Sequence, residues 1–137
     1  MDQISVFIYG TLLPGQSNHH VVSPYLKASS REGWIEARLV DCGDYPAAVR
    51  DDIASMRNSI IRGQWIVVDR EGLAAMDILE AFSGIEESND YERAWLCDSK
   101  DAAAAGWAYV WGVAHGYPAI EQDYWPDYYA SKQKEAE

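Results

Sequence analysis

Apolar residues gather in short runs along this chain, and the spacing within each run predicts a strand or one face of a helix. Residues 4–9 are nearly all apolar, which is typical of a central strand that is buried on both faces. Alternation over residues 34–40 predicts a strand with one buried face. Residues 60–68, 91–97 and 106–113 predict three further strands.

One long helix is predicted over residues 71–82, where apolar side chains recur with the helical period. Asp69 is placed to cap its N-terminus, and Gly84 is placed to end it. Polar and turn-forming residues predict loops at 12–27, 41–46 and 51–58. The first of these loops contains a short helical turn before Pro24, and a short strand over residues 47–49 separates the other two.

The order of these elements predicts a single α+β domain. We expect a small, mixed, mostly antiparallel and barrel-like sheet with one main helix, built from residues 1–130. Residues 131–137 are charged and predict a frayed C-terminal tail.

The formal net charge of −11 limits the partners of the protein rather than its fold. Binding to phosphates needs clustered Lys and Arg, so we expect neither a nucleic acid nor an anionic membrane surface as a partner. A small anion is still compatible, because a local cradle can hold it within an acidic protein. The N-terminus lacks the pattern of a signal peptide and no apolar run is long enough to span a bilayer, so we expect a cytoplasmic protein.

The cysteines and histidines form no recognisable metal or redox motif. Cys42 and Cys97 have neither CxxC nor metal-ligand spacing, and two free thiols fit a reducing compartment. His19 and His20 are adjacent, so their side chains diverge, and with His115 they make a poor set of metal ligands. We therefore expect no metal and no organic cofactor. Oligomeric state leaves no signal in the sequence.

The first strand runs into a turn that carries candidate binding chemistry: Tyr9, Gly10, Thr11 and Leu12. Gly10 can adopt a positive φ, which other residues avoid for steric reasons. Successive backbone N–H groups in such a turn can converge to bind an anion. The turn therefore predicts a small anion-binding site near the start of the chain.

Glu80 is a candidate general acid–base. In a helical projection it falls on the apolar side of the predicted helix, between Leu73 and Met76. A carboxylate in such a place must be paired, protonated or in a pocket, and burial away from cations raises its pKa toward neutrality. Two structural alternatives remain open: the carboxylate reaches water at the rim of the apolar face, or it forms an ion pair with Arg93.

Several short motifs occur together and in order. The Y-G-T-L run at residues 9–12 is followed by Gly15, Asn18 and His19, and the D-x-x-E run at 77–80 is followed by Y-x-R at 91–93. Weaker matches lie at residues 44–47, 106–110 and 120–125. In these motifs and their order the chain resembles the gamma-glutamylcyclotransferase-like (AIG2-like) family, over most of residues 4–125.

The resemblance implies a cyclotransferase that converts a γ-glutamyl amine or amide to 5-oxoproline and a free amine. It places the general acid–base on Glu80 and the substrate-binding turn on residues 9–12. The turn would hold either the α-carboxylate or the developing oxyanion of the substrate. Arg93 is expected to pair with Asp77 or another carboxylate in a structural role. The alternatives are a non-catalytic module that binds a small carboxylated metabolite, and an interaction module that uses the aromatic C-terminal region.

Overall fold

The computed structural model describes residues 3–79 and 91–136. Its strands are β1 (Ile4–Ile8), β2 (Arg31–Glu36), β3 (Arg38–Asp41), β4 (Pro46–Val49), β5 (Ile60–Val68), β6 (Glu92–Cys97), β7 (Ala105–Val110) and β8 (Ala119–Ile120). Its helices are α1 (His19–Val22), the 3₁₀ turn η1 (Ser23–Tyr25), α2 (Asp52–Met56), α3 (Arg70–Leu79) and α4 (Trp125–Ala136). No helix in these described ranges is both long and apolar enough to cross a membrane.

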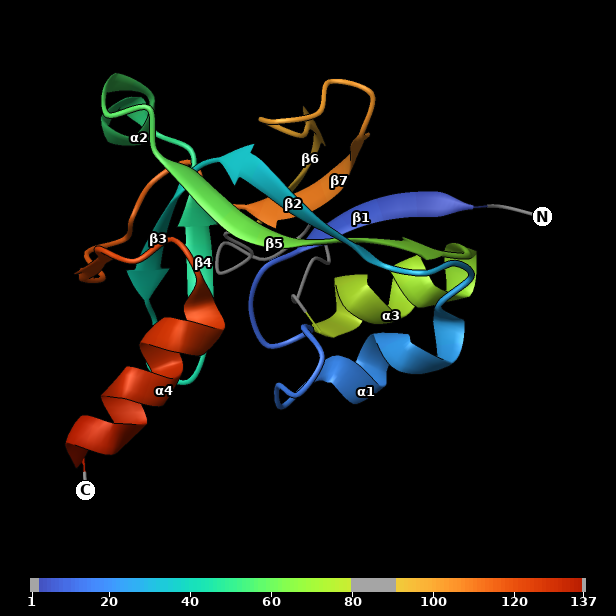
Figure 1. The fold of residues 1–137 in the computed structure, drawn as a ribbon, viewed down its shortest axis with the longest axis horizontal. Helices are drawn as coiled ribbons and strands as arrows, with labels where there is room; N and C mark the ends of the chain where they lie inside the picture. The colour runs from blue at the N-terminus through green and yellow to red at the C-terminus, as the bar shows by residue number, and fades with distance from the viewer. Residues whose placement is uncertain (1–2, 80–90, 137) are drawn as a thin grey trace.

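Strand β1 lies at the centre of a five-stranded sheet with the order β2-β5-β1-β7-β6 (Figure 1). It pairs antiparallel with β5, from Ile4↔Val68 to Ile8↔Gln64, and parallel with β7 at Val6↔Trp107. A second, antiparallel sheet has the order β4-β3-β8. The predicted fold class, α+β with a mixed and mostly antiparallel sheet, is confirmed. The barrel is an open one, in which an isolated bridge between Val49 and Trp111 links the second sheet to the chain after β7.

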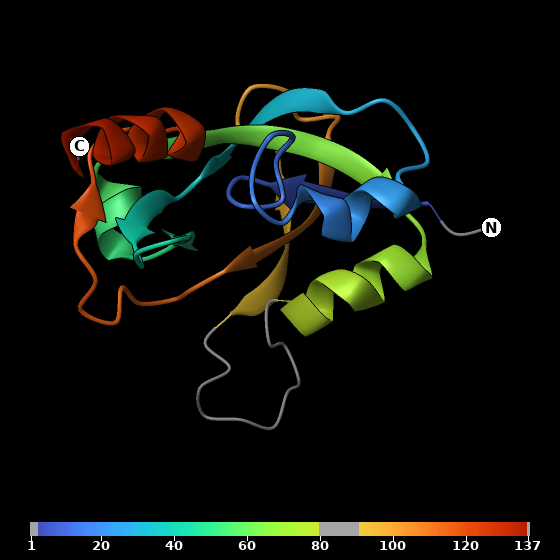
Figure 2. The same cartoon turned by 90° about the horizontal axis from the view of Figure 1, so that it is seen from below.

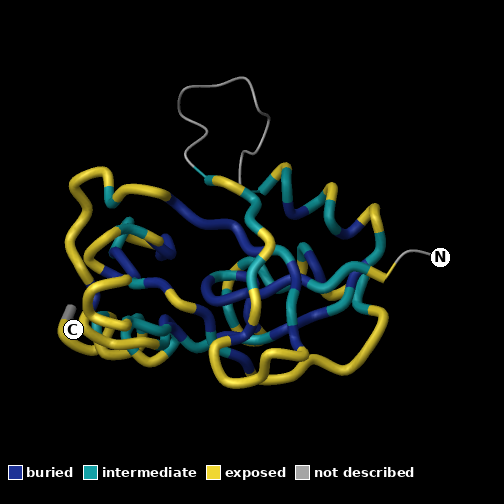
Figure 3. Tube along the Cα trace, turned by 90° about the horizontal axis from the view of Figure 1, so that it is seen from above, coloured by how far each residue is buried: buried dark blue, intermediate teal, exposed yellow. Residues whose placement is uncertain are grey.

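Both faces of β1 are covered, as its apolar run predicts. Val6 and Ile8 point toward a core that includes Met76 of α3 and Val22 of α1. Their neighbour Phe7 points the other way, into a core shared with the second sheet and α4. Figure 2 shows α1 and α3 together on one side of the large sheet, while α4 lies at the opposite end of the molecule beside β3. Buried backbone runs through the centre of the fold and exposed loops surround it (Figure 3).

Three local predictions are wrong. Residues 51–58 contain the short helix α2, which begins because the Asp51 carboxylate accepts a 3.0 Å hydrogen bond from the backbone N–H of Ala54. Ile78 is one of the apolar residues of the predicted helix and is therefore expected to face the core, but it is 81% exposed. The predicted strand over 34–40 is interrupted at Ala37, so that β2 and β3 belong to different sheets.

The segment expected to fray is part of α4, which continues to Ala136. Trp125 at its start is fully buried in the core. One turn further on, Tyr128 donates a 2.6 Å hydrogen bond to Asp41 at the end of β3. Lys132 then forms an ion pair with the same carboxylate at 2.9 Å and also donates to the carbonyl of Gly43. These contacts hold the charged helix on the second sheet, which the local sequence does not indicate.

Candidate functional site

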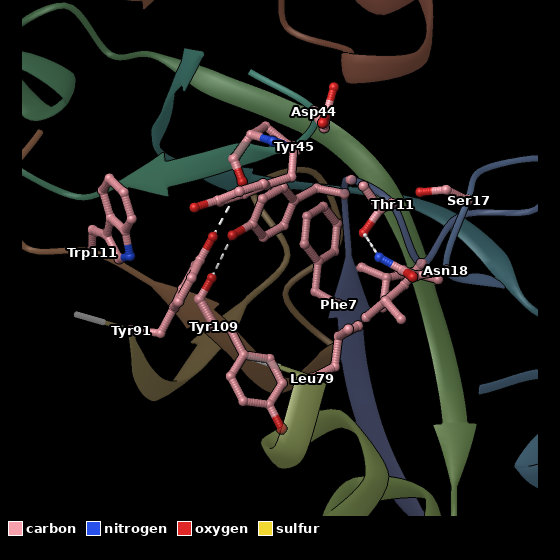
Figure 4. Close-up of a pocket in the computed structure, with 15 residues that line it drawn as sticks. Phe7, Thr11, Ser17, Asn18, Asp44, Tyr45, Leu79, Tyr91, Tyr109 and Trp111 are labelled. Atoms are coloured by element: carbon pink, nitrogen blue, oxygen red, sulfur yellow. Dashed lines mark hydrogen bonds between the residues drawn. The ribbon is translucent and has the colours of Figure 1, made fainter. Parts of the chain in front are cut away.

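A cavity of about 380 Å³ opens where the two sheets and α3 meet. The end of β1 and the turn after it form one wall, the segment leading into β4 forms another, and the last residue of α3 closes a third side. Figure 4 shows Trp111 at one side of the pocket and Thr11 with Asn18 at the other. The described lining residues are Phe7, Ile8, Tyr9, Gly10, Thr11, Leu12, Ser17, Asn18, Asp44, Tyr45, Pro46, Leu79, Tyr91, Tyr109 and Trp111.

All four residues of the predicted binding turn line this cavity. Within the described residues, no hydrogen-bond acceptor is found for the backbone N–H groups of Gly10, Thr11 and Leu12. These groups are therefore not spent on sheet pairing, which ends with Ile8. Such unpaired donors at a pocket wall can hold a carboxylate or an oxyanion.

Gly10 is required for a different reason from the predicted one. Positive φ values occur at other glycines, and at Gly15 within this loop, but not at Gly10. A Cβ atom at position 10 would lie 2.8 Å from Cγ and 2.9 Å from Cδ of Pro46. Glycine is thus needed because the turn and the second sheet approach each other closely, and the expectation of a left-handed backbone at this position is wrong.

Tyr9 lines the pocket, and its hydroxyl group forms hydrogen bonds to the backbone of two other strands. The hydroxyl donates a 2.6 Å hydrogen bond to the backbone carbonyl of Tyr109 and accepts one of 3.3 Å from the backbone N–H of Ala48. Tyr9 therefore joins β1 to β7 and to β4 across the two sheets. The side chain is only 8% exposed, so these bonds lie in a largely dry environment.

The last full turn of α3 is fixed to the large sheet through Asp77. Its carboxylate accepts a 2.7 Å hydrogen bond from Nη1 of Arg93, and a second one from the Tyr109 hydroxyl. The pairing of Arg93 with Asp77, which we predicted, is confirmed. Burial raises the pKa of Tyr109, and the neighbouring Asp77 carboxylate raises it further, so Tyr109 remains a neutral hydrogen-bond donor.

The candidate acid–base Glu80 lies outside the described residues. It follows Leu79 directly in the sequence, and Leu79 lines the cavity as the last residue of α3. The alternatives at Glu80, contact with water at the rim or an ion pair with Arg93, stay untested.

Sequence reasoning missed most of the aromatic residues that line the cavity. Tyr45, Tyr91, Tyr109 and Trp111 line the cavity, although no pattern of spacing places them together. Tyr91 occurs in a motif that carries the resemblance, and Tyr45 and Tyr109 occur in its weaker matches, so the resemblance offers a signal for these three. Trp111 is 3% exposed, and its indole Nε1 finds no hydrogen-bond partner among the described residues.

Neither cysteine lines the cavity, although Cys42 packs against the cluster that includes the lining residue Trp111. Both are free thiols, as predicted. Burial, together with the charge of Asp41, raises the pKa of Cys42 to about 11, so this thiol stays protonated near neutral pH. Cys97 is exposed, although a cysteine outside any reactive motif is usually a buried thiol.

Comparison with known proteins gives a consistent result. Residues 6–127 match the family described as Gamma-glutamyl cyclotransferase, AIG2-like. Over 113 residues the chain is 30% identical to the Gamma-L-glutamyl-butirosin B gamma-glutamyl cyclotransferase of Niallia circulans, covering 78% of this chain and 66% of that protein. The chain spans less than two thirds of the length of the curated relatives that it matches.

Solved structures share the fold at low sequence identity. An AIG2-like protein from Mus musculus aligns with a TM-score of 0.65 at 22% identity, covering 89% of this chain and 88% of that chain. An uncharacterized protein from Pyrococcus horikoshii aligns with a TM-score of 0.67 at 17% identity, covering 96% of this chain and 97% of that chain. At these sequence identities, the structural similarity establishes the fold alone.

Proposed function

Because this chain belongs to the gamma-glutamyl cyclotransferase, AIG2-like family, we propose that it releases 5-oxoproline and a free amine from a γ-glutamyl amine or amide. The observation that carries the proposal is the position of the cavity. One of its walls is the turn of residues 9–12, whose N–H groups at 10–12 lack acceptors in the described chain. Another is Leu79, the residue directly before Glu80.

The reaction needs few groups from the protein. The α-amine of the glutamyl group attacks the γ-carbonyl carbon, so a C–N bond forms within the ring and the C–N bond to the leaving amine breaks. Nucleophile and electrophile belong to one molecule, so holding the reactive conformer can supply an effective molarity of about 10⁵ M or more. A cavity lined by aromatic side chains, among them the buried Tyr109 and Trp111, serves this purpose.

Two proton transfers remain, and we assign both to Glu80. The α-ammonium nitrogen must lose one proton before attack and a second as it becomes the ring amide. The leaving nitrogen must gain one proton before its bond breaks and takes up the second when it is released as the ammonium ion. One carboxylate can take each proton from the ring nitrogen and return it to the leaving nitrogen. The N–H groups of Thr11 and Leu12 would meanwhile hold either the α-carboxylate or the oxyanion that forms on the γ-carbonyl oxygen.

The direct test is incubation with a panel of γ-glutamyl amines and amides, followed by detection of 5-oxoproline by mass spectrometry. Glu80→Gln keeps the shape of the side chain and removes proton transfer, so it should lower kcat by about 10²–10⁴-fold. Glu92→Gln, on the exposed start of β6, is the matched control and should retain activity. An active Glu80→Gln variant would move the assignment to Glu86 or Glu87.

The alternative is a module that binds a small carboxylated metabolite without turning it over. It uses the same turn but does not need Glu80. Saturable binding of 5-oxoproline by the wild-type protein, with no product from any γ-glutamyl compound in the panel, would favour this alternative and contradict the enzymatic proposal.

A further inference from the structure

The carbonyl groups of residues 10–12 in the binding turn all accept hydrogen bonds from residues that follow them in the chain. The carbonyl of Gly10 accepts a 3.1 Å hydrogen bond from the N–H of Leu13, and that of Thr11 accepts one of 2.8 Å from the N–H of Asn18. The carbonyl of Leu12 accepts a 2.8 Å hydrogen bond from Nδ1 of His19. Three consecutive carbonyls are thus engaged by the segment that follows them.

Because the peptide bond is planar and trans, these carbonyl hydrogen bonds also fix the direction of the neighbouring N–H groups. In a trans peptide the C=O of one residue and the N–H of the next point in opposite directions. A carbonyl of Gly10 that faces Leu13 therefore directs the N–H of Thr11 the other way. In the same manner, the bond from Asn18 to the Thr11 carbonyl directs the N–H of Leu12 away from that segment.

His19 locks the last peptide of the turn. The Leu12 residue is only 5% exposed, so its carbonyl needs a partner inside the protein, and an unsatisfied group there would be costly. The N–H on the other side of this peptide belongs to Leu13 and closes the turn onto the Gly10 carbonyl. Without the His19 bond, this peptide plane can rotate, and the hydrogen bond from the Leu13 N–H to the Gly10 carbonyl weakens.

We propose that His19 is a positioning residue, which holds the Leu12 carbonyl and thereby keeps the N–H groups of Thr11 and Leu12 directed at the bound substrate. Asn18 supports the same arrangement, because its side-chain amide donates a 3.0 Å hydrogen bond to the Thr11 hydroxyl oxygen. His19 itself is not among the described residues that line the cavity.

The bond dictates which ring nitrogen carries the proton. A carbonyl oxygen can only accept, so Nδ1 of His19 must be the donor in both the neutral and the charged ring. The neighbouring His20 is exposed and makes no such bond among the described residues. The two adjacent histidines therefore form a matched pair for experiments.

The first measurement needs no ligand. We take the turn as the anion site of the proposed function, but the tautomer of His19 can be read from ¹⁵N NMR of the free protein. Neutral His19 is expected as the Nδ1–H tautomer, assigned by loss of its signals in His19→Leu. A ring that is protonated at Nε2 alone would overturn the proposal, whatever the activity of the protein.

The second measurement titrates 5-oxoproline, which carries a carboxylate, while the amide signals of Thr11 and Leu12 are followed. His19→Leu removes the donor and should weaken binding by about 10-fold, the value of one buried hydrogen bond. His19→Asn keeps an N–H donor near the position of Nδ1 and should restore most of the affinity. His20→Leu is the control and should bind like the wild type.

Wild-type affinity in His19→Leu, or equal losses in His19→Leu and His20→Leu, would contradict the proposal. So would the absence of any shift at Thr11 and Leu12 when the wild-type protein binds 5-oxoproline. Normal binding and the expected tautomer, without product from γ-glutamyl compounds, would instead refute the enzymatic function and leave the role of His19 standing.

Discussion

Asp77 on α3 and Arg93 on β6 form an ion pair with an N–O distance of 2.7 Å, and it joins the end of the helix to the edge of the large sheet. The two side chains are 25% and 26% exposed, so the pair is neither fully solvated nor fully buried. The Tyr109 hydroxyl donates to the same carboxylate from β7. Three elements of the fold therefore meet at one carboxylate, three residues before the candidate acid–base.

Replacement of Arg93 should lower stability. Arg93→Met keeps much of the apolar stem and removes the charge, so that of the described partners of Asp77 only the Tyr109 hydroxyl remains. The expected loss in the free energy of unfolding is about 1–3 kcal/mol, between the values typical of exposed and buried ion pairs. Urea unfolding measures it. Arg31→Met is the control, because the Arg31–Asp101 pair is at least half exposed at 3.7 Å and should contribute little.

The hydroxyl of Tyr9 should matter more for the fold than for contact with the substrate. Tyr9→Phe leaves the ring in place but removes the partner of the Tyr109 carbonyl and of the Ala48 N–H. We expect a loss of about 1–3 kcal/mol, the cost of leaving buried polar groups unsatisfied. Tyr117→Phe, at a side chain that is 43% exposed, should unfold at nearly the same urea concentration as the wild type.

Acid should destabilise the protein, because several aspartates ionise more readily in the folded state. The hydrogen bond from Arg38 lowers the pKa of Asp51. Burial alone would raise the pKa of Asp98, but four hydrogen bonds, among them one of 2.8 Å from the Trp65 indole, lower it. Groups of lowered pKa stabilise the fold above their unfolded value of about 3.9 and lose this contribution as the pH falls below it.

Urea unfolding from pH 7 to pH 3 checks this prediction. The midpoint should be nearly constant above about pH 5 and should fall steeply below about pH 4. Asp98→Asn should be less stable than the wild type at pH 7, and its midpoint should depend less on pH in the acid range. If the urea midpoints of Asp98→Asn and wild type depend on pH in the same way, Asp98 does not contribute to the loss of stability in acid.

The C-terminal helix should hold the turn that carries part of the pocket wall. Lys132 of α4 bonds to Asp41 and to the carbonyl of Gly43, one residue before Asp44 in the cavity lining. Lys132→Met should therefore speed amide hydrogen exchange in residues 42–46. Lys134→Met is the control on the same helix, since Lys134 is exposed and forms no bond of this kind in the described chain.

The sequence predicted those parts of the fold that depend on local pattern. Strand β5 has the predicted bounds, and Asp69 caps α3 by accepting a 2.9 Å bond from the N–H of Gly72, as predicted. These features follow from side chains a few residues apart. Likewise, the turn of residues 9–12 is recognisable as a motif, and it lines the cavity.

What the sequence did not predict depends on partners that are distant along the chain. Helix α4 is held by Asp41, which lies 87 residues from Tyr128 and 91 from Lys132. The need for glycine at position 10 comes from Pro46 in the other sheet. Periodicity and capping report on neighbours within about one helical turn, so such contacts leave no trace in them.

The close approach of Gly10 and Pro46 also means that two parts of the pocket differ in how well they tolerate amino-acid substitution. At Gly10 any added carbon would collide with the second sheet, so this side cannot be remodelled without moving the two sheets apart. Ser17, Asp44 and Tyr45 line the same cavity from exposed positions, where substitution costs little packing. A library at these three positions is therefore the natural way to change the specificity of the proposed activity while the fold stays intact.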